Sequence, residues 1–341
     1  MNKINFYVGV DISSEFFTVS ILDPNGMKYL NFENFENSIN GFENLLSEFR
    51  SAKVDRSNSI TCMEATGVYG EKLAYFLVSS GFNIVIENPL TVKKTFHPKK
   101  GKTDKIDSEQ IAEYAFRFRD KLTIWSPKSE IIEEIRMFLN QREQFINQRT
   151  VNVNAKHAIS KKHFQFKKVI SNYEEIISSI NKTIKLIEKE IMSLIDSDPE
   201  FRQTFSNILS VPGVGKVLGF HLITMTNGFT EHLDSKKLSS YIGIVPIPHQ
   251  SGTSMRLRNS SSGIGPSKFR KVIYMASMSS SLCNEKLKKY YHRKVDEGKN
   301  KKLVLNNIAN KMIKIIIAII KNKKAYMPNF VPINPVFKKL I

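Results

Sequence analysis

The sequence predicts a mixed α/β domain followed by a mainly helical remainder, and three observations support this fold class. Residues 1–126 carry short β-branched and aromatic runs that alternate with segments of helical spacing. The stretch from about residue 130 to 196 has helical spacing throughout, and the basic remainder ends in lysine-rich helical segments. We therefore predict three domains, over residues 1–126, 127–196 and 197–341.

In the first domain, three early strands come before alternating helices and strands. The predicted strands cover residues 4–13, 16–23, 27–34, 59–67 and 82–89. The sequence PNG between the second and third strands predicts a turn. The predicted helices cover residues 38–49, 70–81 and 104–118. This order indicates a mixed sheet with helices on its faces.

The middle domain contains a regular apolar seam. Its members are spaced four and three residues apart alternately: Tyr173, Ile177, Ile180, Ile184, Ile187, Ile191 and Leu194. Three such heptads with Glu and Lys on the flanks predict a coiled-coil arm that pairs protomers in a dimer or tetramer. The same spacing is also typical of a core helix in a bundle, which is the alternative interpretation.

The net charge of the chain is strongly positive and unevenly distributed. The formal charge is +19, and residues 256–324 contain 18 Lys and Arg against three acidic residues. Such a surplus favours a polyanionic partner, chiefly nucleic acid or an anionic membrane.

Several features predict a reduced, cytoplasmic protein that does not span a membrane. Asp11 and Glu15 interrupt the only apolar stretch near the N-terminus, so no signal peptide is predicted. The longest apolar run, at 312–320, contains a lysine and is too short for a bilayer. Cys62 and Cys283 have no metal-ligand spacing.

Four carboxylates lie at predicted strand ends and at a predicted helix start. Asp11 and Glu64 end two strands, while Asp104 and Asp107 are one helical turn apart on one helix face. Mg²⁺ prefers oxygen ligands, and two-metal phosphoryl chemistry needs carboxylates from several elements around ions about 3.5–4 Å apart. We therefore expect a Mg²⁺ site, with two ions and with Mn²⁺ as a substitute.

Each carboxylate also has a structural explanation. Asp11 could begin a turn, Glu64 could cap the next helix, and the two later aspartates could complement a helix N-terminus that Thr103 caps. The neighbouring lysines favour the functional interpretation, because Lys102 and Lys105 suit a nucleic-acid backbone better than a structural cap.

An ordered set of motifs resembles a known family over nearly the whole chain. The motifs are YVGVDIS, MEATGVYGEKLAYFL, IENPLTVKKTF, KTDKIDSEQIAEYA, LSVPGVG, LSSYIGIVPIPHQSGTS, GPSKFRKVIYMAS and KNKKLVLNNIANKMIKII. They look like those of the DEDD-type transposases of bacterial insertion sequences, also known as bridge-RNA-guided recombinases. The resemblance implies a RuvC-like (RNase H-type) N-terminal domain whose acidic residues are Asp11, Glu64, Asp104 and Asp107. Ser108 departs from the pattern, since family members often carry alanine there.

A segment rich in serine, glycine and arginine, HQSGTSMRLRNSSSGIG, could hold a nucleophile. A serine that attacks a DNA phosphate must be exposed on a turned segment beside cations. Ser251, with Arg256 and Arg258 close behind, meets this requirement, although such clusters are also ordinary loop material. The resemblance implies that Ser251 is the family's nucleophilic serine, with Thr253 and Ser254 as the rivals to test.

Further residues are candidates for contact with nucleic acid. The sequence VPGVGK, with Gly213, Gly215 and Lys216, resembles the hairpin of helix-hairpin-helix modules, where amides at a helix start hold a phosphate. A turn between two helices explains it equally well. Arg270 and Lys271, and the aromatic-basic sequence KLKKYYHRK at 286–294, could follow phosphates or stack on bases. A solvated basic helix is the alternative interpretation there.

The leading hypothesis is a DNA recombinase that excises and inserts its own mobile element. The resemblance implies serine attack on DNA and a structured noncoding RNA that pairs with target and donor DNA. A metal-dependent nuclease that leaves Ser251 idle is the second hypothesis. A non-catalytic nucleic-acid-binding protein is the third. Because the arm separates the carboxylates from the serine along the chain, we expect a complete site to combine two protomers.

Overall fold

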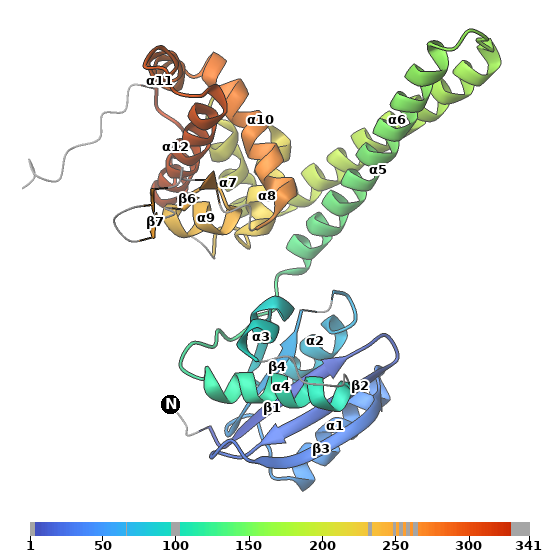
Figure 1. Cartoon of the computed structure of the whole chain (residues 1–341), viewed down its shortest axis with the longest axis vertical. Coiled ribbons are helices and arrows are strands. Elements are labelled where there is room, and N and C mark those ends of the chain that lie inside the picture. Colours follow the sequence, from blue (N-terminus) through green and yellow to red (C-terminus); the bar gives the residue numbers. More distant parts are fainter. Residues whose placement is uncertain are drawn as a thin grey trace, which may run out of the picture. The chain divides into compact units, whose positions relative to one another are not determined.

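The computed structural model describes residues 4–65, 67–96, 103–230, 234–247, 250–251, 255–256, 260–261 and 265–328. For 246–247, 250–251, 255–256 and 260–261 it describes only the backbone. The chain divides into two compact units, Met1–Pro127 and Lys128–Ile341, and Figure 1 shows the sheet in the first and the helices of the second.

The first unit contains one mixed sheet with helices on both faces. Its elements are β1 (Phe6–Ile12), β2 (Phe16–Leu22), β3 (Lys28–Glu36), α1 (Ile39–Ser51), β4 (Ser59–Glu64), α2 (Glu71–Ser79), β5 (Ile84–Glu87), α3 (Pro89–Thr95) and α4 (Asp104–Arg117). The strand order is β3-β2-β1-β4-β5. β1 pairs antiparallel with β2 and parallel with β4, which pairs parallel with β5. The predicted mixed α/β fold is confirmed and is consistent with an RNase H-like domain.

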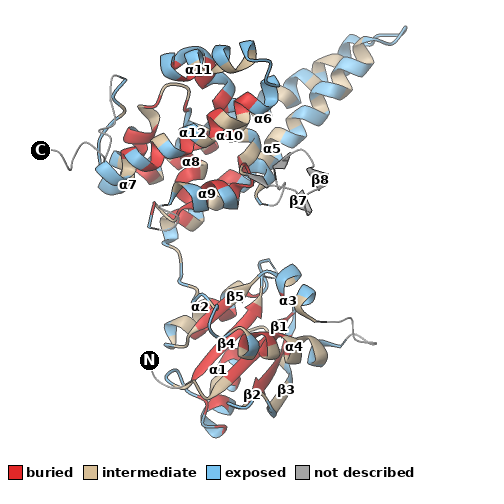
Figure 2. Ribbon diagram, turned by 60° about the vertical axis from the view of Figure 1, so that its left-hand side comes forward, coloured by how far each residue is buried: buried red, intermediate tan, exposed pale blue. Residues whose placement is uncertain are grey.

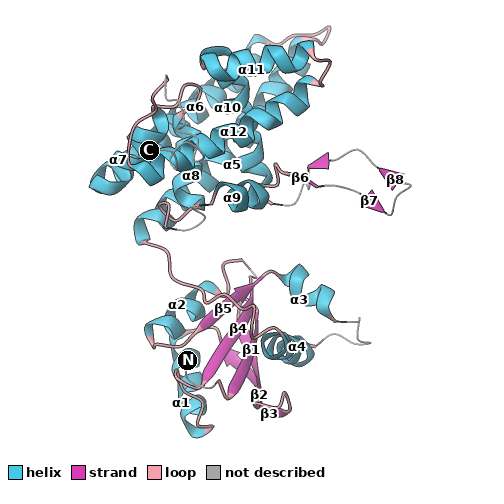
Figure 3. Cartoon of the chain, turned by 90° about the vertical axis from the view of Figure 1, so that its left-hand side faces the viewer, coloured by secondary structure: helices cyan, strands magenta, loops and turns pink. Residues whose placement is uncertain are grey.

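The alternation of side chains along β1 builds two separate cores. Val8 and Val10 point to the face covered by α1 and α2, where they are fully buried. Tyr7 points to the opposite face and packs with Ile111 of α4 and Val92 of α3. Figure 3 shows the two helix pairs on opposite sides of the sheet, and Figure 2 shows the strands buried between them.

The described part of the second unit is mainly helical, as predicted for the chain beyond residue 127. Its helices are α5 (Glu130–Ser160), α6 (Lys167–Ser197), α7 (Pro199–Leu209), α8 (Lys216–Met225), α9 (Ser235–Ile242), α10 (Ser267–Cys283), α11 (Glu285–Asp296) and α12 (Lys301–Asn322). Its short strands are β6 (Pro246–Ile247), β7 (Gln250–Ser251), β8 (Met255–Arg256) and β9 (Ser260–Ser261). They form two antiparallel pairs, β6 with β9 and β7 with β8.

The apolar seam of α6 packs against α5 of the same chain. Arg142 of α5 donates to Glu188 of α6 at 2.8 Å, and Arg149 donates to Asn181 at 3.2 Å. Five isoleucines of α6 are buried: Ile180, Ile184, Ile187, Ile191 and Ile195. At the end of the seam Ile195 is buried and Leu194 only partly so, because a straight helix drifts away from a strict seven-residue repeat. A coiled coil between protomers stays a prediction.

The base of this hairpin shares a core with the C-terminal helices. Ile132 and Ile135 of α5 and Ile191 of α6 belong to the same buried cluster as Phe220 of α8 and Ile316 of α12. The separation of residues 127–196 from 197–341 as domains stays a prediction.

Helix α12 is the one described helix whose length and composition would allow it to cross a membrane. It nevertheless packs against α7, α9, α10 and α11. Its buried residues include Ile308, Met312 and Ile316, whereas Lys311 and Lys314 are exposed. Since one face is buried in protein and the other carries charge, we assign α12 as a core helix.

Candidate functional site

Three carboxylates end three adjacent parallel strands of the first unit. Asp11 is the last residue but one of β1, and Val10 before it pairs with Met63, so Asp11 lies beside Glu64 at the end of β4. Glu64 itself pairs with Glu87 of β5. Gly9 faces α4, and side chains alternate along a strand, so Asp11 lies on the α4 face of the sheet. All three residues are partly exposed. The carboxyl ends of parallel strands thus place acidic groups at one edge of the sheet.

The first turn of α4 lies at the same edge. A Cβ on Gly9 would meet Ser108 O at 2.3 Å and Ala112 N at 2.2 Å, while Phe116 packs on Tyr7 with ring centroids 5.3 Å apart. Helix α4 therefore runs antiparallel to β1, and its N-terminal turn is nearest the end of β1 that carries Asp11. This turn holds the two remaining predicted carboxylates, Asp104 and Asp107.

The structure brings the four predicted carboxylates to one end of the sheet. Carboxylate oxygens are the donors that a hard divalent cation takes, so the donor chemistry fits. Among the described residues, no group of three or more His, Cys, Asp or Glu side chains is arranged to hold a metal ion. The metal-ligand set therefore stays a prediction.

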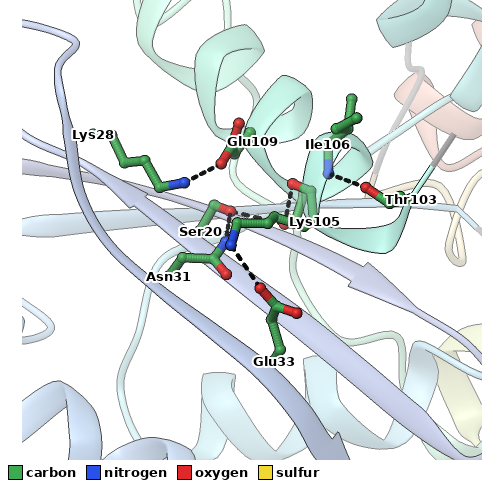
Figure 4. A network of polar contacts seen from close by, with 9 residues as sticks. Ser20, Lys28, Asn31, Glu33, Thr103, Lys105, Ile106 and Glu109 are labelled. Atoms are coloured by element: carbon green, nitrogen blue, oxygen red, sulfur yellow. Dashed lines mark hydrogen bonds and ion pairs between the residues drawn. The ribbon is translucent and has the colours of Figure 1, made fainter. Parts of the chain in front are cut away.

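A chain of hydroxyls fastens the first turn of α4 to the sheet (Figure 4). Asn31 Nδ2 donates to Ser20 Oγ at 2.6 Å, Ser20 Oγ lies 2.8 Å from Ser108 Oγ, and Ser108 Oγ donates to Lys105 O at 3.0 Å. Because the Ser108 proton goes to Lys105 O, the bond between the two serines is donated by Ser20. The serine that departs from the family pattern is thus fully buried with its hydroxyl satisfied.

Charged groups beside this turn are paired. Lys105 contacts Glu33 at 2.8 Å, and Lys28 contacts Glu109 (Figure 4). The hydrogen bond and the charge of Glu33 raise the pKa of Lys105. Contact between Lys105 and nucleic acid stays a prediction, and Lys102 lies outside the described residues. Thr103 Oγ1 accepts from Ile106 N at 3.3 Å, so the helix also has the structural cap that the sequence suggests.

Glu87 is a member of this edge that sequence reasoning missed. Burial is the main reason why the pKa of the Cys62 thiol is raised, and the charges of Glu87 and Glu64 raise it further. Burial, followed by the charge of Glu87, also raises the pKa of Tyr114 on α4. The sequence did contain a signal for Glu87. It is an acidic residue near the end of a predicted strand, and the same feature identified Glu64.

In the second unit, Ser251 is the last residue of β7. It pairs with Met255 of the antiparallel strand β8. Residues 252–254 and 257–259 lie outside the described residues, and they include Thr253, Ser254 and Arg258. The role of Ser251, and those of Arg256 and Arg258, stay predictions.

The two predicted glycine contacts differ in their surroundings. Gly213 has a φ of +92°, and a Cβ there would lie 2.5 Å from Ser280 N, so close packing on α10 explains this glycine. Gly215 precedes α8, which has no side-chain cap, and a Cβ there would meet nothing within 4 Å. The start of α8 at Lys216 therefore offers uncapped backbone amides and open space, as a phosphate needs.

The two predicted contacts on α10 also differ. Arg270 Nη1 donates to Gly265 O at 2.9 Å and to Ile242 O at 3.2 Å, so this guanidinium ties α10 to the end of α9. Lys271 is exposed. Nucleic-acid contact by either residue stays a prediction.

Two protein-family models match the chain. A DEDD-type IS110 family described as transposase matches residues 8–165, and the Transposase IS116/IS110/IS902 family matches residues 206–292. Together these matches cover more than half of the chain and enclose all five predicted catalytic residues.

Several known proteins are similar to this chain, some over most of its length and others over part of it. The pilin gene-inverting proteins of Moraxella lacunata and Moraxella bovis are each 27% identical over 324 residues, which cover 94% of this chain and 97% of the relative. A 44.8 kDa protein of insertion element IS116 from Streptomyces clavuligerus is 25% identical over 143 residues, 39% of this chain and 35% of the relative.

Proposed function

Because the chain belongs to the DEDD-type transposase family of insertion sequences, and is thus a DNA recombinase, we propose that it moves its element by serine attack on DNA phosphates. The observation that carries this proposal is the family match in both units, since one match holds the carboxylate edge and the other holds Ser251. The strand-end placement of Asp11 and Glu64 supports the same conclusion.

In the proposed reaction, the Ser251 hydroxyl forms a bond to a DNA phosphorus atom. The phosphorus–oxygen bond of the backbone breaks, and the proton lost by serine ends on the leaving hydroxyl. The phosphoserine ester conserves the energy of the broken bond, so the free hydroxyl of another strand can displace the serine without ATP. Rejoining regenerates the serine and the DNA backbone.

The carboxylate edge would hold the divalent cation on which this family's chemistry depends. Asp11, Glu64, Asp104 and Asp107 are the proposed ligands, with Mg²⁺ as the cation and Mn²⁺ as a substitute. When bound, the cation would neutralise charge on the scissile phosphate. The protein itself would hold these carboxylates in place on two strands and one helix, and Ser108 would fasten the first turn of that helix, α4, to the sheet.

We further propose that a structured noncoding RNA selects the DNA sites in the cytoplasm. Sequence choice would then belong to base pairing, and the protein would bind shape and backbone. The charge of +19 suits a complex with two kinds of nucleic acid. Recovery of one defined RNA with the purified protein, lost after nuclease treatment, is the expected result.

Inversion of a DNA segment is a second candidate function. It is favoured by the match to the pilin gene-inverting proteins, which extends over nearly the full length of both chains. Inversion requires every cut end to be rejoined, so it suits a covalent serine intermediate as well. Sequencing of the rearranged DNA separates the two.

The test is a search for DNA bound covalently to the protein. The gene is expressed with its native flanking DNA, and the protein is purified under denaturing conditions. Wild-type protein should carry DNA, and Ser251→Ala should carry none, because only the attacking serine forms the ester. Thr253→Ala and Ser254→Ala are the matched controls and should keep the adduct.

A different outcome would favour the nuclease hypothesis. If no variant carries DNA, while wild type and Ser251→Ala nick DNA equally with Mg²⁺, the carboxylate edge acts on water and the serine is idle. An adduct on Ser254→Ala but not on Thr253→Ala would move the nucleophile to Thr253.

A further inference from the structure

Helices α11 and α12 and the segment after α12 enclose a groove of about 1140 Å³ in the second unit. We call it the α11–α12 groove. None of its lining residues is a proposed catalytic residue, and one of its sides is the aromatic-basic segment 286–294 that the sequence marks as a candidate for nucleic-acid contact.

The charge of the groove is of one sign. None of its lining residues is acidic, and six are cationic: Lys286, Lys289, Arg293, Lys311, Lys314 and Lys324. All six are exposed on the two helices and the following segment. Charges of one sign around a concave surface favour a ligand that carries several negative charges.

The floor of the same groove is apolar and includes an aromatic ring. Leu287 and Ile319 are buried, while Ile315 and Tyr290 are partly exposed. The Tyr290 ring has Lys311 Nζ at 4.5 Å and the Arg293 guanidinium at 5.8 Å from its centroid. A purely ionic ligand would leave the apolar side chains of this floor, Leu287, Ile315 and Ile319, without a partner.

The segment after α12, which forms the third side of the groove, is held in place by hydrogen bonds. Lys323 ends α12 in the left-handed conformation, with a φ of +50°, which turns the chain back over the helices. Tyr326 then donates its backbone N–H to Ser210 Oγ at 2.7 Å and accepts at its hydroxyl from Asn284 Nδ2 at 3.1 Å. The groove is therefore preorganised, which lowers the cost of binding.

We propose that the α11–α12 groove binds single-stranded nucleic acid, with phosphates on the rim lysines and a base against Tyr290. Unpaired strands are the polyanions that also expose flat apolar rings, and stacking on aromatic side chains is their usual mode of recognition. A duplex keeps its bases stacked internally and could use only the rim. The strand could come from RNA or from a displaced DNA strand, since both share this chemistry.

The test measures binding of the full-length protein to fluorescent oligo-uridine, oligo-thymidine and a duplex of equal length. EDTA is present, so failure here leaves the proposed catalysis untouched. Tyr290→Ala should weaken single-strand binding about tenfold, and Tyr290→Phe should not, because the ring is kept. Lys311→Ala/Lys314→Ala should reduce the salt slope of single-strand binding by about 1.4.

A matched control uses two exposed lysines of the same helix outside the groove. Lys301→Ala/Lys302→Ala removes the same charge and should leave both the affinity and the slope nearly unchanged. Strands that carry a photoreactive thio-base should crosslink to peptides containing Tyr290 or Met327. Whichever strand binds more tightly, uridine or thymidine, identifies the source.

Three results would overturn the proposal. One is an equal loss of affinity in the Lys301/Lys302 and Lys311/Lys314 variants, which would indicate diffuse attraction. Another is a Tyr290→Ala protein that binds single strands as well as wild type does. The third is crosslinking confined to peptides outside the groove. Thermal unfolding of each variant establishes that the fold is intact.

Discussion

Gly9 lies where β1 and α4 approach most closely, two residues before Asp11. Any side chain there would collide with the backbone of α4 at Ser108 and Ala112, and backbone atoms cannot rotate away as a side chain can. The absence of a Cβ at this position therefore sets the distance between the strand that carries Asp11 and the helix that carries Asp107.

The first prediction concerns this contact. Gly9→Ala should destabilise the first unit by about 3 kcal/mol, the upper end of overpacking costs, and lower its unfolding temperature by roughly 10 °C. Ser14→Ala, an exposed substitution just after β1, is the control and should leave the temperature unchanged. Calorimetry on both variants checks this, and a Gly9→Ala protein as stable as wild type would contradict the packing described here.

At the scale of elements, α6 shows how one helix face is divided between burial and solvent. Its isoleucines at helical spacing pack on α5, while Ile176 is 45% exposed on the same helix. The seven-residue pattern predicted an apolar seam on α6. Other helices of the same chain cover the C-terminal part of this seam, where the buried isoleucines lie. If α6 pairs protomers, it would do so through the apolar residues that remain exposed on the α5–α6 hairpin.

The second prediction tests this division. Ile191→Ala removes a fully buried side chain and should lower the free energy of unfolding by about 2–4 kcal/mol. Ile176→Ala should change it by less than about 0.5 kcal/mol. Denaturant titration of the two variants measures both values. A loss in Ile176→Ala that depends on protein concentration would instead place Ile176 in an interface between protomers.

At the scale of the whole molecule, the proposed catalytic groups lie on two units with separate cores. The carboxylates belong to the sheet unit, and Ser251 belongs to the helical unit. We therefore predict that a complete site combines the carboxylates of one protomer with Ser251 of another in a dimer or tetramer.

The third prediction uses mixed protomers. Asp11→Ala and Ser251→Ala proteins should each be inactive alone, because each lacks one half of the site. If the site is shared between protomers, mixing them should restore covalent DNA attachment to roughly a quarter of the wild-type level by random assortment in a dimer. Coexpression with two distinguishable tags measures this. No recovery in verified mixed oligomers would place the whole site within one chain.

The sequence by itself determined the local periods and the order of chemical groups. Strand alternation and helical spacing predicted the five strands, the long helices and the mixed α/β unit, because these patterns depend on neighbours in the chain. It also placed acidic residues at two strand ends and at the start of α4. The expected Thr103 cap at that start is present as well.

Only the tertiary structure decided which elements meet. Strand pairing brought Glu87 beside Glu64, the approach of α4 to β1 gave Gly9 and Ser108 their roles, and α5 filled the α6 seam. It likewise brought basic residues of α11 and α12 together along one groove, which Tyr290 also lines. Such contacts join residues far apart in the chain, and a local pattern shows that a face needs a partner without specifying which one.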